Sequence, residues 1–352
     1  MTVYIRTEAN RTTATGHMTR CIAIAKEIKA MGGEAVFIVA EEGSMRMPDE
    51  AGFKCLCLNR TWDDFDGEIP VILELIDNNN IKCILVDSYF VTEKYMAAIS
   101  EKTKTAYIDD LHERIWPVHA IINYAVYSDL FDYESEYPDS DLLLGTEYMP
   151  LRPEYTDIEA REKTDCKNVL VVTGGGDEYH FIKKLAGIVS GDEEIKASKA
   201  SAEVIKNMCF TFICGAFNVD YDELAERYGD GRYENIKILK SVPSLKDYLL
   251  EADMIVTAGG TTLYEAAMCQ VPCIAFRIAD NQDYNVTAFG KKGLAIDAGD
   301  VRYDFSYEEL MQHICEISEN KEFRDEMRRK QSNAVDGRGA GRIASYLMSK
   351  CN

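Results

Sequence analysis

The sequence is short of basic residues, and this shortage excludes two classes of partner. Its 352 residues include 39 lysines and arginines against 60 aspartates and glutamates, a formal net charge of −21. Residues 1–150 contain 13 basic and 26 acidic residues, a net charge of −13. Nucleic acid binds to basic faces that neutralise its phosphates, so we expect no nucleic-acid partner. An acidic N-terminal half is equally unsuited to docking on anionic lipid.

Long apolar runs are also missing. No stretch reaches the roughly 18 apolar residues that a membrane-spanning helix needs, so we expect no stable membrane insertion. Met1 is followed directly by the strand-like segment Val3–Arg6, without the basic and apolar regions of a secretory signal. The sequence therefore predicts a cytoplasmic protein, and it leaves the oligomeric state open.

The spacings that hold metals and common cofactors are absent too. There are eleven cysteines, but most lie in apolar runs, and the short pair Cys55 and Cys57 alternates along a strand without a histidine pair nearby. This pattern predicts small buried thiols in a reducing compartment and no metal site. The chain also lacks a GxGxxG dinucleotide fingerprint and a Walker A loop, so we expect no cofactor.

What is present is a regular alternation of strand-like and helix-like segments, which predicts α/β domains with parallel, doubly wound sheets. A charged, proline-containing stretch at residues 150–167 is typical of a linker. We therefore expect two Rossmann-like domains facing a cleft, at residues 1–150 and 151–352, with the last helix returning to the first domain. The acidic, turn-rich segment Tyr127–Asp141 is expected to be a surface loop.

The stretch Thr15–Cys21 carries the strongest chemical signal. It lies where a loop after the first strand becomes the first helix, at the carboxyl edge of the expected sheet, where ligands of such folds collect. A helix N-terminus favours a neutral imidazole and attracts anions. His17 is therefore expected to act as a general base.

Two glycine turns mark the second domain. The turn Gly174–Gly176 follows a strand, and from the residues alone it is as much a tight structural turn as a binding loop. The segment Ala258–Glu265 is more specific, because free amides at a helix start near Thr261 and Thr262 can hold a diphosphate. Glu265 lies one turn further on and is expected to accept hydrogen bonds from a ribose. The amides of Asn281 and Gln282 suit sugar hydroxyls and N-acetyl groups.

Taken in order, these motifs resemble the UDP-sugar hydrolases of pseudaminic acid biosynthesis, which release UDP from a diacetamido-trideoxy-altrose nucleotide. That family is related to the peptidoglycan N-acetylglucosaminyltransferase and shares its GT-B fold. The resemblance covers nearly the whole chain. The segments that carry it are Thr15–Cys21, Val86–Tyr89, Ile108–Leu111, Leu143–Tyr148 with Leu151–Glu154, Gly174–Asp177, Ala258–Thr262 and Asp280–Gln282.

The resemblance implies a role for each matched residue. His17 would activate the water that displaces UDP with inversion. The residues implied in UDP binding are Gly175, Val242, Gly259, Gly260, Thr261, Thr262 and Glu265. Those implied in sugar binding are Gly16, Arg20, Asp87, Tyr89, Asn281 and Gln282.

The sequence departs from the family pattern at two positions, and three further functions are compatible with its motifs. Gly176 and Ser88 stand where the family often has serine and histidine, so the identity of the sugar is open. A GT-B glycosyltransferase would use the same UDP-sugar with a soluble or lipid hydroxyl in place of water. A sugar-nucleotide epimerase of the same architecture and a non-catalytic protein that binds sugar nucleotides would need the same second domain.

Overall fold

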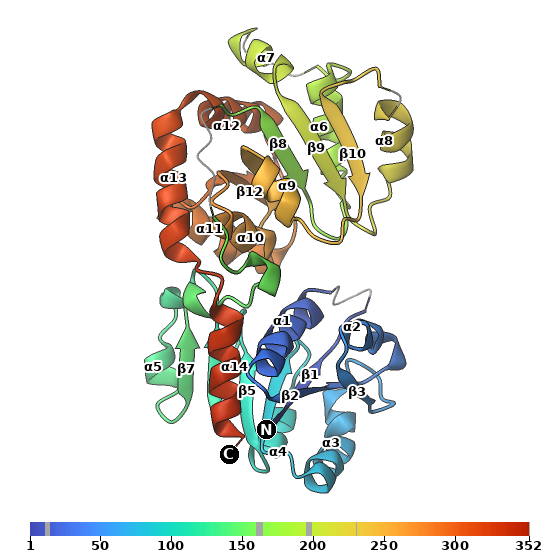
Figure 1. The fold of residues 1–352 in the computed structure, drawn as a ribbon, viewed down its shortest axis with the longest axis vertical. Helices are drawn as coiled ribbons and strands as arrows, with labels where there is room; N and C mark the ends of the chain where they lie inside the picture. The colour runs from blue at the N-terminus through green and yellow to red at the C-terminus, as the bar shows by residue number, and fades with distance from the viewer. Residues whose placement is uncertain (11–14, 160–164, 195–198, 230, 352) are drawn as a thin grey trace. The chain divides into compact units, whose positions relative to one another are not determined.

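The computed structural model describes residues 1–10, 15–159, 165–194, 199–229 and 231–351. The chain divides into two compact units. Unit 1 comprises residues 1–156 and 336–352, and unit 2 comprises residues 157–335. Each unit is an α/β domain with one parallel sheet, as the alternation of segments predicts, and each is described by itself below (Figure 1).

Unit 1 is built on seven parallel strands in the order β3-β2-β1-β4-β5-β6-β7. The strands are β1 (Thr2–Thr7), β2 (Glu34–Val39), β3 (Lys54–Cys57), β4 (Cys83–Asp87), β5 (Lys104–Ile108), β6 (Ala120–Asn123) and β7 (Asp141–Leu144). The helices are α1 (Gly16–Ala30), α2 (Arg46–Glu50), α3 (Phe65–Asn79), α4 (Glu93–Ser100), α5 (Tyr133–Glu136) and α14 (Gly339–Lys350), with short 3₁₀ turns at Glu42–Ser44, Ser128–Leu130, Thr146–Tyr148 and Pro153–Tyr155.

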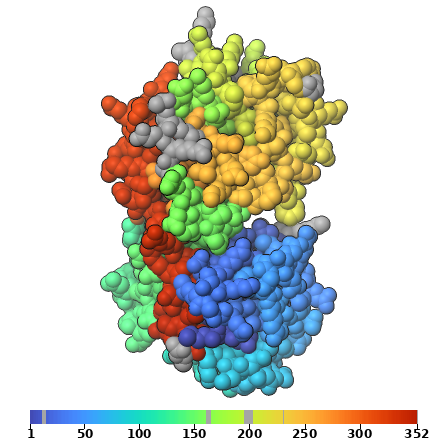
Figure 2. Space-filling view, viewed as in Figure 1, coloured from blue at the N-terminus to red at the C-terminus, as the bar shows by residue number. Residues whose placement is uncertain are grey.

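The central strands of unit 1 are nearly continuous apolar runs because helices cover both faces of the sheet. Ile84, Leu85 and Val86 of β4 are all fully buried. α14, the last helix of the chain, packs against α1 and the turn at Thr146–Tyr148. In Figures 1 and 2 its red ribbon and atoms lie against the blue and green parts of unit 1. The end of the sequence thus completes the first unit.

The segment Tyr127–Asp141 is not the surface loop expected from its acidic composition. It contains α5, and Tyr133 and Tyr137 are 1% and 4% exposed within the core of unit 1. Glu134, between them, is exposed, so the acidic composition of the segment does not reveal its two buried rings. The acidic composition of the segment also gives no indication that β7 begins at Asp141.

Unit 2 has six parallel strands in the order β10-β9-β8-β11-β12-β13. The strands are β8 (Asn168–Val172), β9 (Cys209–Cys214), β10 (Ile236–Lys240), β11 (Met254–Ala258), β12 (Cys273–Arg277) and β13 (Ile296–Asp300). The helices are α6 (Phe181–Ser190), α7 (Lys199–Lys206), α8 (Tyr221–Tyr228), α9 (Lys246–Glu251), α10 (Thr262–Met268), α11 (Asp283–Lys292), α12 (Tyr307–Glu319) and α13 (Lys321–Ala334), with a 3₁₀ turn at Asp280–Gln282.

All eleven cysteines are free thiols. Among the described residues, none of the helices combines the length and apolar character that crossing a bilayer requires.

Candidate active site

The strand order of unit 1 reverses between β1 and β4. β1 continues toward β2 and β3 on one side, and β4 continues toward β5 on the other, so the loops after β1 and β4 diverge at this point. Ligands of open α/β sheets bind at such a switch point, outside the carboxyl ends of the strands. α1, which follows β1, brings His17 here, and Asp87 is the last residue of β4.

His17 and Asp87 form a directly hydrogen-bonded pair. His17 Nδ1 lies 2.7 Å from Asp87 Oδ1, and the two residues are 6% and 0% exposed. Burial disfavours the charged form of Asp87, but the neighbouring Arg20 guanidinium and the His17 ring outweigh it and hold the pKa of Asp87 well below its usual range. The ionised carboxylate therefore accepts the Nδ1 proton of His17. The Nε2 lone pair of His17 is left able to take a proton, as a general base requires.

Arg20 ties this pair to the rest of unit 1. Its Nε and Nη2 donate to the two oxygens of Asp87 at 2.7 and 2.5 Å, which is a bidentate ion pair. Its Nη1 donates to Asp110 Oδ2 at 2.7 Å and also contacts the Tyr124 hydroxyl. The motif resemblance implies that Arg20 binds the sugar, and the structure gives each of its terminal nitrogens a protein carboxylate. Its contact with a sugar stays a prediction.

Tyr89 covers one side of His17. The two rings meet edge to face with centroids 4.4 Å apart, and the Tyr89 hydroxyl donates to Asp110 Oδ2 at 3.1 Å. Gly16, at the start of α1, has open space around the position of a Cβ atom. Both residues therefore lie beside His17, as a sugar-binding role would need.

Sequence reasoning misses Asp110 and Tyr124 as members of this cluster. Asp110 Oδ2 accepts hydrogen bonds from Arg20, Tyr89 and Tyr124. The available signal is the pair Asp109-Asp110 directly after an apolar strand, since carboxylates there fall at the carboxyl edge of the sheet. Burial raises the pKa of the adjacent Asp109 to about 6, although the amide of His112 donates to this carboxylate.

Unit 2 has its own switch point, between β8 and β11. The turn Gly174–Gly176 follows β8, and Gly259 with Gly260 follows β11. Gly174 has φ +91°, which favours glycine, and a Cβ on Gly215 would lie 2.1 Å from the Gly174 carbonyl oxygen. The close approach of Gly215 is a structural reason for the first turn.

The two glycines after β11 differ. A Cβ on Gly259 would lie 2.3 Å from Val286 Cγ2, so this glycine allows α11 to pack closely. The Asn285 side chain stabilises this packing of α11 by donating a hydrogen bond to the Gly259 carbonyl at 2.8 Å. A Cβ on Gly260 would meet nothing within 4 Å. The open space beside Gly260 is what the approach of a ligand to the backbone requires.

The other predicted UDP-binding residues lie on the same carboxyl edge. Thr262 begins α10, and the first amides of a helix have no intrahelical acceptor. Glu265 follows one turn later and is 9% exposed. Val242 lies in the loop after β10, next to Ser241, whose φ is +42°.

Asn281 and Gln282 belong to the short turn after β12. The amide oxygen of Gln282 accepts a hydrogen bond from the backbone amide of Ile278 at 2.9 Å, so part of this side chain stabilises the turn. Asn281 is exposed. The structure gives every predicted residue of unit 2 a place on the carboxyl edge of its sheet; the ligand that each contacts remains a prediction.

Within the described ranges, no three histidine, cysteine, aspartate or glutamate side chains converge to hold an ion.

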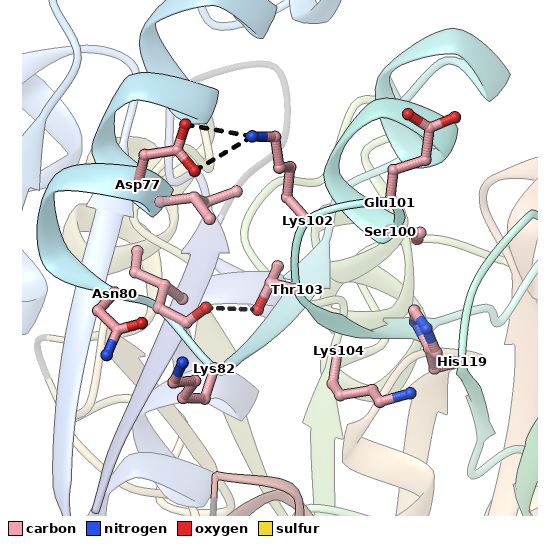
Figure 3. A pocket seen from close by; sticks show the side chains of 11 residues that line it. Asp77, Asn80, Lys82, Ser100, Glu101, Lys102, Thr103, Lys104 and His119 are labelled. Atoms are coloured by element: carbon pink, nitrogen blue, oxygen red, sulfur yellow. Dashed lines mark hydrogen bonds and ion pairs between the residues drawn. The ribbon is translucent and has the colours of Figure 1, made fainter.

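The cavity in Figure 3 lies at the opposite, amino edge of the unit 1 sheet and has a volume of about 340 Å³. Its lysines sit where α3 and α4 end, and cations there offset the negative ends of helices. Lys102 pairs with Asp77 at 3.2 Å, and the Thr103 hydroxyl donates to the Ile81 carbonyl at 2.8 Å. Because the cavity lies at the edge of the sheet opposite His17, it is not part of the candidate site.

Comparison with known proteins finds a domain family that is similar to most of unit 2. Residues 169–340 match the glycosyltransferase family 28 C-terminal domain. The chain is 26% identical over 232 residues to the spore coat polysaccharide biosynthesis protein SpsG of Bacillus subtilis, a match that covers 65% of this chain and 64% of the relative. The match thus spans slightly less than two thirds of that relative's length.

Solved structures share the fold over the whole chain. MurG of Acinetobacter baumannii superposes with a TM-score of 0.70 at 12% identity and covers 99% of both chains. The UDP co-structure of MnaA from S. aureus has a TM-score of 0.66 at 12% identity and covers 98% of this chain and 95% of the other. These likenesses confirm the predicted two-Rossmann-domain GT-B fold.

Proposed function

We propose that this protein transfers a glycosyl group from a UDP-sugar, with His17 as the general base. The observation that carries the proposal is the buried His17–Asp87–Arg20 arrangement at the switch point of unit 1. The glycosyltransferase domain matched by residues 169–340 supports the choice of a nucleotide-sugar donor.

In this mechanism the side chains of unit 1 remove the proton from the attacking hydroxyl. Asp87 accepts the Nδ1 proton of His17 and fixes the ring, and Arg20 keeps Asp87 ionised. His17 Nε2 then removes a proton from the attacking hydroxyl as the bond to the anomeric carbon forms. General-base assistance of this kind contributes about 10²- to 10⁴-fold to the rate.

Unit 2 is assigned the nucleotide. The amides of Gly259 and Gly260 already donate to the Phe276 and Ala258 carbonyls, both at 2.9 Å. Backbone amides at Thr261 and Thr262 would therefore hold the diphosphate and stabilise the charge that grows on it as it departs. Glu265 would accept hydrogen bonds from the ribose, and Val242 with Gly175 would contact the uridine portion. In unit 1 we assign sugar contacts to Gly16, Arg20 and Tyr89, whereas the fully buried Asp87 would act through His17 and Arg20. In unit 2 the residues assigned to the sugar are Asn281 and Gln282.

Hydrolysis of a UDP-linked acetamido-deoxy sugar, with water as the acceptor, is the second candidate. The burial of His17 favours it, because a base that is 6% exposed and covered by the Tyr89 ring is more accessible to water than to a bulky hydroxyl. The motif resemblance to the pseudaminic acid hydrolases also supports it. The product would then be the free sugar with inverted anomeric configuration.

One experiment separates these functions. The purified protein is incubated with UDP-2,4-diacetamido-2,4,6-trideoxy-altrose, or with UDP-N-acetylglucosamine, and UDP release and the product anomer are followed by NMR. Release without any acceptor that is lost in His17→Ala establishes hydrolysis. Release that requires an added saccharide acceptor establishes transfer. UDP binding without release from either donor, with or without acceptor, would contradict both and favour a non-catalytic binding protein.

A further inference from the structure

Two of the eleven free cysteines lie together although they are 268 positions apart in the sequence. Cys83 is the first residue of β4 and is 1% exposed, and Cys351 directly follows α14 and is partly exposed. Their side chains are close enough for each thiol to shift the pKa of the other. Cys351 Sγ also donates to the carbonyl of Thr2 in β1, the strand beside β4, at 3.5 Å.

The end of α14 is fixed in this position by contacts that do not involve sulfur. Lys350 forms an ion pair with Asp141 of β7 at 2.8 Å, and the Tyr346 hydroxyl donates to the same carboxylate at 2.8 Å. α14 also contacts β1 and β4. The two thiols therefore meet because the fold holds them, and not through the chance orientation of a loose terminus.

Cys351 is partly exposed, and a small cavity reaches Cys83. This cavity has a volume of about 110 Å³ and is lined by Tyr346 and Lys350 of α14. It shares Lys104 and His119 with the larger cavity of Figure 3. The neighbouring Cys83 thiol lowers the pKa of Cys351, against the opposing effect of burial, and the positive N-terminus lowers it further. Cys351 is thus the thiol better suited to react first, since the thiolate is the nucleophile.

We propose that Cys83 and Cys351 form a reversible disulfide that fastens the C-terminal helix to the central sheet of unit 1. The oxidant is a low-molecular-weight disulfide. The Cys351 thiolate attacks one of its sulfurs, and one small thiolate leaves. The Cys83 thiol then loses its proton and attacks Cys351 Sγ, which releases the second small thiolate. The protein loses two electrons and two protons, and the small disulfide is reduced to two thiols.

The test uses the full chain in glutathione disulfide, followed by alkylation of the remaining thiols and peptide mass mapping. We expect Cys83 and Cys351 to lose alkylation together and to appear as one cross-linked peptide. Cys209 is exposed and serves as an internal control for reaction with glutathione disulfide. Reaction at Cys209 without a Cys83–Cys351 cross-link would overturn the proposal.

Serine variants give the matched controls. Cys83→Ser should leave Cys351 as a stable glutathione adduct, and Cys351→Ser should leave Cys83 as a free thiol. A Tm measurement adds a second readout: the oxidised wild type should melt several degrees above the reduced form, and Cys351→Ser should show no such gain. An equal gain in Cys351→Ser would contradict the assignment. None of these readouts depends on the proposed glycosyl transfer.

Discussion

The switch points of the two units occupy the same place in similar sheets, but they differ in the residues that surround them. In unit 1 the position is filled by buried charged side chains: the His17–Asp87 pair, Arg20 and Asp110. In unit 2 it is formed by glycine turns, with open space beside Gly260. Buried side-chain charge is suited to proton transfer, and accessible backbone is suited to holding a ligand. The difference predicts that unit 1 is damaged by changes of charge and unit 2 by changes of volume.

The largest expected effect is on turnover after removal of the base. His17→Asn should lower kcat by about 10²- to 10⁴-fold because no group remains to take the proton. UDP binding, measured by calorimetry, should be unchanged because unit 2 is intact. His112→Asn is the matched control, since that ring pairs with Glu136 rather than with the cluster. A variant of His17 with full activity would refute its assigned role.

Neutralising Asp87 should have the second largest effect. Asp87→Asn leaves Arg20 buried with half of its charge pairing gone, and breaking a buried ion pair in this way costs about 3–5 kcal/mol of unfolding free energy. Urea denaturation of both proteins measures the loss. Because the pKa of Asp87 is depressed in the folded state, its contribution is present above the unfolded pKa of about 4 and disappears at lower pH. The difference in unfolding free energy between the wild type and Asp87→Asn should therefore shrink in acid. A difference that does not change with pH would show that the charge of Asp87 is not its cause.

Asp109 gives the opposite dependence on pH. Burial raises its pKa to about 6, so the folded state binds more protons than the unfolded state between about pH 4 and pH 6. Stability should fall as pH rises through this window, by at most about 1.4 kcal/mol per pH unit. Asp109→Asn should remove this slope from the denaturation curves, and exposed Asp139→Asn is the control for loss of charge. An unchanged slope in Asp109→Asn would show that another group causes it.

The smallest expected effect tests whether unit 2 is sensitive to side-chain volume at its glycine turns. Gly259→Ala forces a Cβ against Val286 and should cost about 1–3 kcal/mol, seen as a lower Tm. Gly260→Ala meets no neighbour, so its Tm should stay close to that of the wild type while its affinity for UDP falls. Equal behaviour of the two variants in both assays would remove the distinction between packing and ligand contact.

The sequence predicts the parallel α/β architecture because buried parallel strands leave continuous apolar runs, such as Cys83–Val86. It also predicts that His17 lies at the start of the first helix, because a polar loop before a helix is a local pattern. It does not predict that Asp110 and Tyr124 meet Arg20, since the partners are 90 and 104 positions away. The fold of Tyr127–Asp141 escapes prediction for a related reason: its buried tyrosines are recognised only when the surrounding core is known. A single sequence shows local patterns, but it does not show which residues far apart along the chain come into contact.

The return of α14 to unit 1 also affects the order in which the protein can be made. Residues 157–335 form a separate body inserted into the sequence of the first unit, so during synthesis they leave the ribosome ahead of the last helix. Domains generally fold as they leave the ribosome, starting from the N-terminus. Here the first unit to be started is the last to be finished: until residue 350 is released, α1 and β4 lack the helix that packs on them. A chain truncated after residue 335 should therefore contain a folded second unit and an unfinished first unit.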